Sequence, residues 1–298
     1  MSDIYMAIID GTGEEDDAKY AESMKHSFCR QLADCLGKRN SFYVRGPSAA
    51  GKETPACAKD AFDWLRILNN SQRRLMLAGY SRGGSAAIMA AEMLAGHGIE
   101  VDSLFLFDAV ARHTASGGEV IPANVRFSRH ARRNQSLMFV LKYESTFSDL
   151  KESKVDVLGS ANFFAASNPT RPTFGNTGLT WRGNGDHEIA TSFKGSHGAL
   201  GGVGWSFVEE DTQCQEDVAR FMNGHLEARQ VPAKLVSKAP EGPQAAPGWS
   251  TLVVPGAILD LVLLGKHYFT TQAAGPEPDV SARLRALAEN PPSYVRRR

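Results

Sequence analysis

The stretch that decides the fold runs from residue 73 to residue 94, with Gly79-Tyr80-Ser81-Arg82-Gly83 at its centre. The apolar letters before this pentapeptide predict a short buried strand, and the Ala-, Met- and Ile-rich letters after it predict a packed helix. A serine between such a strand and helix lies on a sharp turn that lifts its hydroxyl above the sheet. Glycine on both flanks leaves room for the chain to reverse. The pattern predicts a serine placed as a nucleophile for acyl transfer.

The rest of the chain continues this alternation of short apolar runs and helical patterns. We expect further strands at 4–9, 41–45, 103–107, 137–143 and 188–193, and helices at 16–36, 55–68, 84–94 and 211–227. Strands that alternate with helices form a mostly parallel sheet with helices on both faces. The predicted fold class is therefore α/β, with a loop-rich insertion in its second half.

Composition divides the chain into three parts. Residues 1–230 carry the alternating elements and form the predicted catalytic domain; within it, residues 144–187 fit no simple α/β unit. A lid or binding loop, or irregular packing over the core, would account for that insertion. Residues 231–248 contain four prolines and predict a linker. Residues 249–298 are a C-terminal extension expected to pack on the domain or a partner, since their apolar segment 252–264 is too short to span a bilayer. Contact of that segment with a membrane surface is the alternative.

Charge and cysteine content exclude several classes of function. Among 298 residues, 33 Lys and Arg balance 33 Asp and Glu, so nothing in the net charge indicates nucleic acid as a partner. The four cysteines form no C-x-x-C pair and no metal spacing, which favours reduced, buried thiols. We expect neither a cofactor nor a resident metal, and a dependence on calcium stays open. No signal peptide precedes the first strand, so we expect synthesis in the cytoplasm.

A nucleophilic serine needs a histidine base and an acid that orients it. Asp108 ends the apolar run 104–107, and side chains at the carboxyl ends of parallel strands surround the ligand site of α/β proteins. His197 lies in a glycine-dense loop directly after a predicted strand. We therefore predict Ser81 as nucleophile, His197 as general base and Asp108 as the orienting acid. The alternatives are Asp149, Asp156 and Asp186 for the acid, and His113, His130, His187, His225 and His267 for the base.

The oxyanion of acyl transfer needs two backbone N–H groups. The residue after the nucleophile, Arg82, supplies one at the start of the helix, and a loop after a neighbouring strand supplies the other. The first strand is the only one that ends in a suitable glycine turn. We therefore predict Gly11 or Thr12 as the second donor.

Five separated motifs together resemble one family. They are Asp10-Gly11-Thr12-Gly13, Tyr43-Val44-Arg45-Gly46, Gly79-Tyr80-Ser81-Arg82-Gly83, Phe107-Asp108-Ala109-Val110, and Phe193-Lys194-Gly195-Ser196-His197 with Gly201-Gly202. In this order they resemble the bacterial α/β-hydrolase family that supplies the catalytic domain of type VI secretion phospholipase effectors. The resemblance covers residues 4–225. The chain departs from the family at Gly84, at Gly198-Ala199 and at Arg132-Arg133.

The resemblance implies an α/β-hydrolase-like fold and hydrolysis of glycerophospholipid esters. The site residues it implies are Ser81, Asp108 and His197. It also implies antibacterial use: a type VI system secretes the protein into target cells, with a secretion spike protein as carrier and an immunity protein as neutraliser. The expected substrate is a phospholipid at a membrane surface, and nucleic acid is not an expected partner.

Two other interpretations stay open. Residues 46–52 match the first seven positions of a phosphate-binding P-loop, but Glu53 replaces the Ser or Thr that binds the metal, and Pro55 removes a backbone donor. The chain could also be a catalytically inactive binding protein on a hydrolase scaffold, because a fold does not fix a function.

Overall fold

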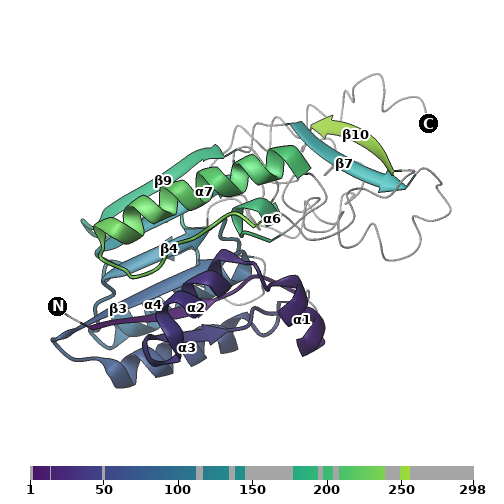
Figure 1. Ribbon diagram of the computed structural model, residues 1–298. Helices are drawn as coiled ribbons and strands as arrows, with labels where there is room; N and C mark the ends of the chain where they lie inside the picture. The colour runs from purple at the N-terminus through teal and green to yellow at the C-terminus, as the bar shows by residue number, and fades with distance from the viewer. Residues whose placement is uncertain are drawn as a thin grey trace, which may run out of the picture.

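A six-stranded parallel sheet forms the centre of the molecule (Figure 1). The computed structural model describes residues 3–13, 15–48, 51–111, 117–133, 138–144, 177–193, 197–203, 208–238 and 249–255. The strand order is β2-β1-β3-β4-β6-β9, and every neighbouring pair is parallel. These strands are β1 Asp3–Ile9, β2 Ser41–Val44, β3 Arg73–Tyr80, β4 Ser103–Phe107, β6 Phe127–Arg133 and β9 Asp186–Phe193.

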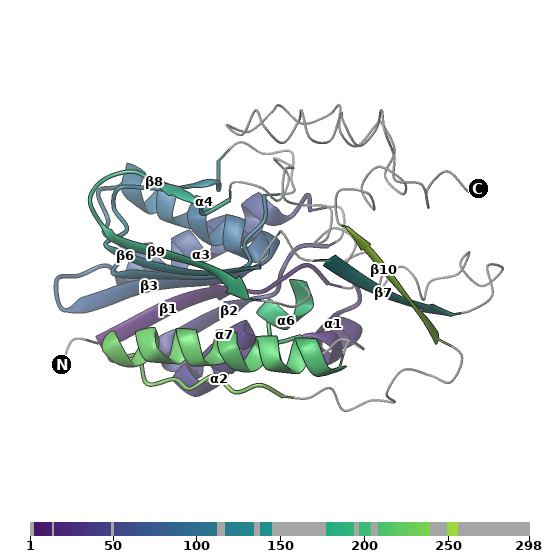
Figure 2. The ribbon, with the colours of Figure 1, turned by 90° about the horizontal axis from the view of Figure 1, so that it is seen from above.

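Helices cover both faces of the sheet, as the sequence predicted (Figure 2). They are α1 Asp17–Ser23, α2 Phe28–Asn40, α3 Thr54–Leu68, α4 Arg82–Gly96, α6 His197–Leu200 and α7 Val208–Ala228. Alternate residues of β1 belong to two separate apolar clusters, since successive side chains of a strand point to opposite faces. Met6 and Ile8 pack with α2 and α7, whereas Ala7 and Ile9 pack with α3 and α4.

The first predicted helix is two helices in the structure. The periodicity of residues 16–36 predicted one continuous element, but α1 ends at Ser23 and α2 begins at Phe28. Ser27 is the N-cap of α2, because its hydroxyl accepts a hydrogen bond from the Arg30 N–H at 2.9 Å. The same hydroxyl also donates to the buried Asp10 carboxylate. The break therefore places the start of α2 against the turn after β1.

Strand β6 is the strand of the six-stranded sheet that the sequence did not predict. Its seven residues, Phe-Ser-Arg-His-Ala-Arg-Arg, include three arginines and one histidine, so they carry no apolar run. Strand β6 nevertheless lies inside the sheet between β4 and β9. The predicted strand at 137–143 exists as β7 Met138–Glu144, but it does not join this sheet. It pairs with β10 Trp249–Pro255 in an antiparallel ribbon. A further small parallel pair joins β5 Val120–Ile121 to β8 Thr180–Trp181.

The predicted domain boundaries stay predictions, although parts of them can be described. Residues 145–176 of the insertion, residues 239–248 of the linker and residues 256–298 of the extension lie outside the described residues. The first part of the linker, residues 231–238, packs against the domain. Leu235 is buried there, and the backbone N–H of Val236 donates to the Gln31 side chain of α2 at 2.9 Å.

Candidate active site

Ser81 lies on a strained turn between β3 and α4. Its backbone has φ 56° and ψ −128°, a conformation that residues other than glycine rarely adopt. A Cβ atom on Gly79 would fall 2.4 Å from the Gly83 carbonyl oxygen, and one on Gly83 would fall 2.2 Å from the Asp10 carbonyl oxygen. Both flanking glycines are therefore required for the turn to close against β1. The backbone strain lies at the residue predicted to be the nucleophile.

The three predicted triad residues meet at the carboxyl ends of β3, β4 and β9. His197 Nδ1 lies 2.7 Å from Asp108 Oδ2, and His197 Nε2 lies 2.8 Å from Ser81 Oγ. A carboxylate can only accept, so Nδ1 carries the proton and Nε2 is the acceptor for the serine hydroxyl. All three side chains are buried. The geometry is that of a serine with its base within hydrogen-bond reach and an acid that fixes the tautomer of the base.

His130 holds the loop that carries Asp108 and is not itself placed as a base. The Ala109 N–H donates to His130 Nε2 at 3.0 Å, and His130 Nδ1 lies 3.2 Å from the Gly178 carbonyl oxygen. Burial lowers the pKa of His130 to about 3, so the ring is neutral near pH 7. Both ring nitrogens are therefore hydrogen-bonded to backbone groups, one of them on the residue after Asp108.

Arg132 is a fully buried cation beside the acid, and sequence reasoning missed its role. Its guanidinium Nε lies 3.6 Å from Asp108 Oδ1, and its Nη1 donates to the Ala109 carbonyl. Burial lowers the pKa of Arg132, while the negative charge of Asp108 acts in the opposite direction. An arginine on a strand without apolar periodicity gave no sequence signal for this contact. Asp108 thus has a cationic neighbour on β6 as well as its histidine partner.

Tyr80, in the second position of the pentapeptide, fixes the loop of His197. Its hydroxyl donates to the His197 carbonyl at 3.1 Å, and the two ring centroids lie 5.0 Å apart. A Cβ atom on Gly11 would fall 2.3 Å from the Tyr80 ring, and one on Gly201 would fall 2.4 Å from it. The ring therefore fills the space between the turn after β1 and the loop of His197. These contacts explain why glycine stands at both positions.

The predicted oxyanion donors belong to two turns that contact one another through the side chains of Arg82 and Thr12, but the surroundings of the donors differ. Arg82 is the first residue of α4, where backbone N–H groups have no partner within the helix. The Gly11 N–H donates to its neighbour Asp10 Oδ1 at 2.7 Å. Of the two candidates on the turn after β1, this leaves the N–H of Thr12. The Arg82 side chain bridges this turn and the loop after β2, because its Nη1 contacts Thr12 Oγ1 at 3.3 Å and the Ser48 carbonyl at 2.9 Å.

The alternative acids and bases that can be described have other partners. Asp186 and His225 contact Arg129, and His187 Nδ1 contacts Ser128 Oγ at 2.7 Å at the start of β9. That position is the opposite end of β9 from His197. Four alternatives, Asp149, Asp156, His113 and His267, lie outside the described residues.

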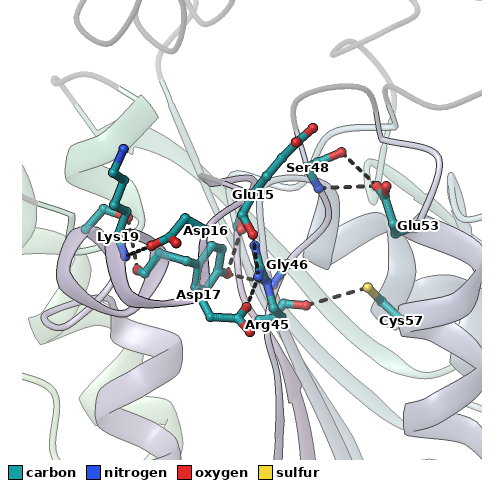
Figure 3. Close-up of polar contacts among 12 residues, drawn as sticks. Glu15, Asp16, Asp17, Lys19, Arg45, Gly46, Ser48, Glu53 and Cys57 are labelled. Carbon is teal, nitrogen blue, oxygen red and sulfur yellow. Dashed lines mark hydrogen bonds and ion pairs between the residues drawn. The ribbon is translucent and has the colours of Figure 1, made fainter.

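Glu53 closes the loop that resembles a P-loop. Both the N–H and the hydroxyl of Ser48 approach Glu53 Oε2, at 3.3 Å and 2.9 Å (Figure 3). A carboxylate therefore occupies the loop donors that would face a phosphate in a P-loop. Its negative charge would also repel such a ligand. This geometry disfavours the nucleotide-binding alternative.

The described residues hold no group of three or more His, Cys, Asp or Glu side chains arranged to bind a metal ion. No helix in the described part of the chain has the length and apolar character needed to cross a bilayer. None of the four cysteines, all of which lie in the described residues, forms a disulfide; three are buried as expected, whereas Cys35 is exposed.

Comparison with known proteins gave structural likenesses only. No protein-family model matches the chain, and no curated protein matches it by sequence. A cutinase-like protein from Cryptococcus sp. aligns at 21% identity with a TM-score of 0.25, over 37% of this chain and 55% of that one. The NocB thioesterase domain from the nocardicin cluster aligns at 16% identity with a TM-score of 0.36, over 74% of this chain and 94% of that one. YbtT, a type II thioesterase of the yersiniabactin pathway, aligns at 9% identity with a TM-score of 0.35, over 78% of this chain and 95% of that one.

The sheet order, the strained serine turn and the chain order Ser81, Asp108, His197 define the class of fold. It is an α/β-hydrolase-like fold, with Ser81 after a central strand and Asp108 and His197 after strands further along the same sheet. The fold class predicted from the sequence is thereby confirmed.

Proposed function

We propose that the protein is a serine-dependent lipid ester hydrolase, a phospholipase A-like enzyme. The observation that carries the proposal is the continuous chain of hydrogen bonds from Ser81 through His197 to Asp108. The resemblance of five ordered motifs to phospholipase effectors supports a phospholipid as the substrate. A membrane-surface phospholipid is therefore the proposed partner, with no cofactor.

The geometry supports a two-step acyl transfer. His197 Nε2 takes the proton of the Ser81 hydroxyl while Ser81 Oγ attacks the ester carbonyl carbon, and Asp108 stabilises the imidazolium that forms. The N–H groups of Arg82 and Thr12 stabilise the oxyanion. His197 then gives its proton to the leaving alcohol, and the acyl group stays on Ser81. Water, deprotonated by His197, releases the acid and restores the enzyme.

A labelling experiment tests the nucleophile. Wild-type protein should form a covalent adduct with a fluorophosphonate probe at Ser81, and Ser81→Ala should not. The same pair, incubated with mixed bacterial phospholipids, should differ in the release of fatty acid and lysophospholipid measured by mass spectrometry. A folded wild-type protein that forms no adduct would contradict the proposal and favour the inactive binding protein.

A matched pair of histidine variants tests the base. His197→Ala should lower kcat/KM by orders of magnitude, because it removes the only base within reach of Ser81 among the described residues. His187→Ala removes a ring that contacts Ser128 and Trp181 at the other end of β9, and should keep near-normal activity. The reverse result would show that the base is misassigned.

Delivery by a type VI system into bacterial target cells is proposed from the motif resemblance, with a secretion spike protein and an immunity protein as partners. Wild-type protein exported to the periplasm of a test bacterium should stop growth and change its phospholipids, whereas exported Ser81→Ala should not. Equal growth of the two strains would contradict antibacterial use, but it would not contradict the proposed esterase activity.

A further inference from the structure

The peptide bond between Gly11 and Thr12 has one of its two polar ends held by a buried tyrosine. The hydroxyl of Tyr20 donates to the Gly11 carbonyl oxygen at 2.8 Å. That carbonyl and the Thr12 N–H belong to the same planar, trans peptide unit, so they point in opposite directions. A group that fixes the direction of the carbonyl therefore also fixes the direction of the N–H.

Tyr20 is itself held in place from the loop after β2. It is buried on α1, and the Gly46 N–H donates to its hydroxyl oxygen at 2.6 Å. The Arg45 guanidinium lies 4.4 Å from the centre of the Tyr20 ring. Arg45 is in turn bonded to the Glu15 carbonyl and the Asp17 carboxylate at the start of α1 (Figure 3). The Tyr20 hydroxyl thus accepts from Gly46 and donates to Gly11, and the Tyr43 side chain is a further hydrogen-bond partner.

Gly46 is the position that lets this arrangement form. A Cβ atom there would fall 1.9 Å from the Gly11 carbonyl oxygen and 2.3 Å from the Asp10 carbonyl oxygen. Only glycine lets the loop after β2 approach the turn after β1 so closely. The Tyr43-Val44-Arg45-Gly46 motif therefore supplies the stacking cation and the backbone donor that fix Tyr20.

The peptide unit before Gly11 is held by other groups. Its N–H, on Gly11, donates to Asp10 Oδ1, and the other carboxylate oxygen accepts from Ser27 and from the Tyr43 hydroxyl at 2.8 Å. Two consecutive peptide units of the turn are therefore held by different side chains. Asp10 and Tyr43 act on the first unit, and Tyr20 acts on the second.

We propose that Tyr20 is a positioning residue of the oxyanion site: by holding the Gly11 carbonyl, it directs the Thr12 N–H toward the carbonyl oxygen of the ester bound at Ser81. The assignment rests on the proposed esterase function. The hydrogen bond also polarises the peptide, which strengthens the N–H as a donor. Burial raises the pKa of Tyr20, so its hydroxyl keeps the donated proton across the working pH range.

The test compares two tyrosine-to-phenylalanine variants at pH 8 with a soluble p-nitrophenyl ester. Tyr20→Phe should lower kcat about 10- to 100-fold with KM changed less than about threefold, because loss of a whole oxyanion donor costs about 100- to 1,000-fold. Tyr5→Phe makes the same chemical change near the start of β1, where the buried ring packs against Trp64, and leaves the bond to the Gly11 carbonyl intact. It should retain kcat within about threefold.

A second measurement separates misdirection of the donor from general loosening. An alkyl boronic acid forms a tetrahedral adduct with Ser81 that mimics the transition state, and its affinity should fall by the same factor as kcat in Tyr20→Phe. Rates are normalised to the number of sites labelled by fluorophosphonate, so a partly unfolded preparation does not affect the comparison. Equal losses in both variants, or unchanged boronic acid affinity in Tyr20→Phe, would overturn the inference.

Ser81→Ala distinguishes failure of the inference from failure of the proposed function. If Ser81→Ala still hydrolyses the ester, the proposed function is wrong and Tyr20 has no oxyanion to serve. If Ser81→Ala is inactive while Tyr20→Phe keeps wild-type kcat, the esterase assignment stands and only the role of Tyr20 is wrong.

Discussion

At the scale of single residues, the site depends on polar groups that are buried and paired. Ser81, His197 and Asp108 form one chain of hydrogen bonds, and Arg132 lies against its acid end. Buried polar groups are costly unless they have partners, so each one constrains the backbone around it. Asp10 is the clearest case, because a carboxylate with no exposed surface accepts hydrogen bonds from three groups.

Asp10 should make the stability of the protein depend on pH. Burial raises its pKa from 3.8 to about 6, against the opposing effect of the hydrogen bonds from Ser27 and Tyr43. The folded state therefore binds the proton more tightly than the unfolded state, and this contribution to stability is lost as pH rises through 6. Wild-type protein should therefore lose about 2 kcal/mol of this stability between pH 4 and pH 7. Asp10→Asn has no proton to lose at this position, so its free energy of unfolding should rise by that amount relative to wild type over the same range.

Urea unfolding of both proteins at the two pH values measures this difference. A difference that is the same at pH 4 and pH 7 would show that Asp10 titrates alike in the folded and unfolded states.

At the scale of elements, the turns after β1, β3 and β9 are in contact with one another. Tyr80 fills the space between two of them, and the Gly201 carbonyl accepts from the Phe28 N–H at the start of α2 at 2.8 Å. The short helix α6 lies at the end of β9, next to this contact (Figure 2). Packed side chains and backbone thus fix the loop of His197 from two sides.

Gly201→Ala should therefore damage activity through the position of His197. The new methyl group would meet the Tyr80 ring, which must move, and the ring contacts both the backbone and the side chain of His197. We expect kcat/KM to fall about 100-fold, since small misplacements of catalytic groups cost about that much. The measurement is ester hydrolysis per folded molecule.

Gly96→Ala is the matched control. It makes the same change at the end of α4, where a Cβ atom meets nothing within 4 Å. It should keep full activity and raise stability by about 0.5–1 kcal/mol, because alanine favours helix more than glycine does. Equal activity of the two variants would contradict the contact between Gly201 and Tyr80.

At the scale of the whole molecule, a network of ion pairs links strands and a helix end at the end of the sheet opposite the site. Asp102, just before β4, binds Arg74 of β3 at 2.9 Å and Arg229 after α7 at 2.7 Å. Burial alone would raise the pKa of Asp102, but the hydrogen bonds from the two arginines outweigh it and the pKa is lowered. The network joins early and late parts of the chain, far from the triad.

Asp102→Ala should destabilise the fold by about 2 kcal/mol and leave kcat unchanged. The expected cost is below that of breaking a fully buried ion pair, because about 15% of the Asp102 side chain stays exposed and so do parts of both arginines. Asp63→Ala, which removes an exposed pair with Lys59, should cost less than about 1 kcal/mol. Urea unfolding and ester hydrolysis measure the two effects; a loss of activity in folded Asp102→Ala would contradict the separation of the two ends.

Much of the fold was predictable because its signals are local. Continuous apolar runs identify strands buried on both faces, and a serine between a strand and a helix identifies the turn at Ser81. The arrangement of Ser81, Asp108 and His197 followed from their places at the ends of such strands, and the structure brings the three together. Their catalytic roles stay predictions, as do the boundaries of the insertion and the linker.

The sequence by itself determined the parallel α/β arrangement, the turn at Ser81 and the carboxyl-end positions of Asp108 and His197. Tertiary structure alone decided that polar β6 lies inside the sheet, that β7 pairs with β10, that Arg132 contacts Asp108 and that Tyr20 contacts the Gly11 carbonyl. The physical reason is the range of the interactions. Apolar periodicity is a property of adjacent residues, whereas a buried arginine, histidine or aspartate is stable only with partners from distant segments, and those partners are fixed only when the chain has folded.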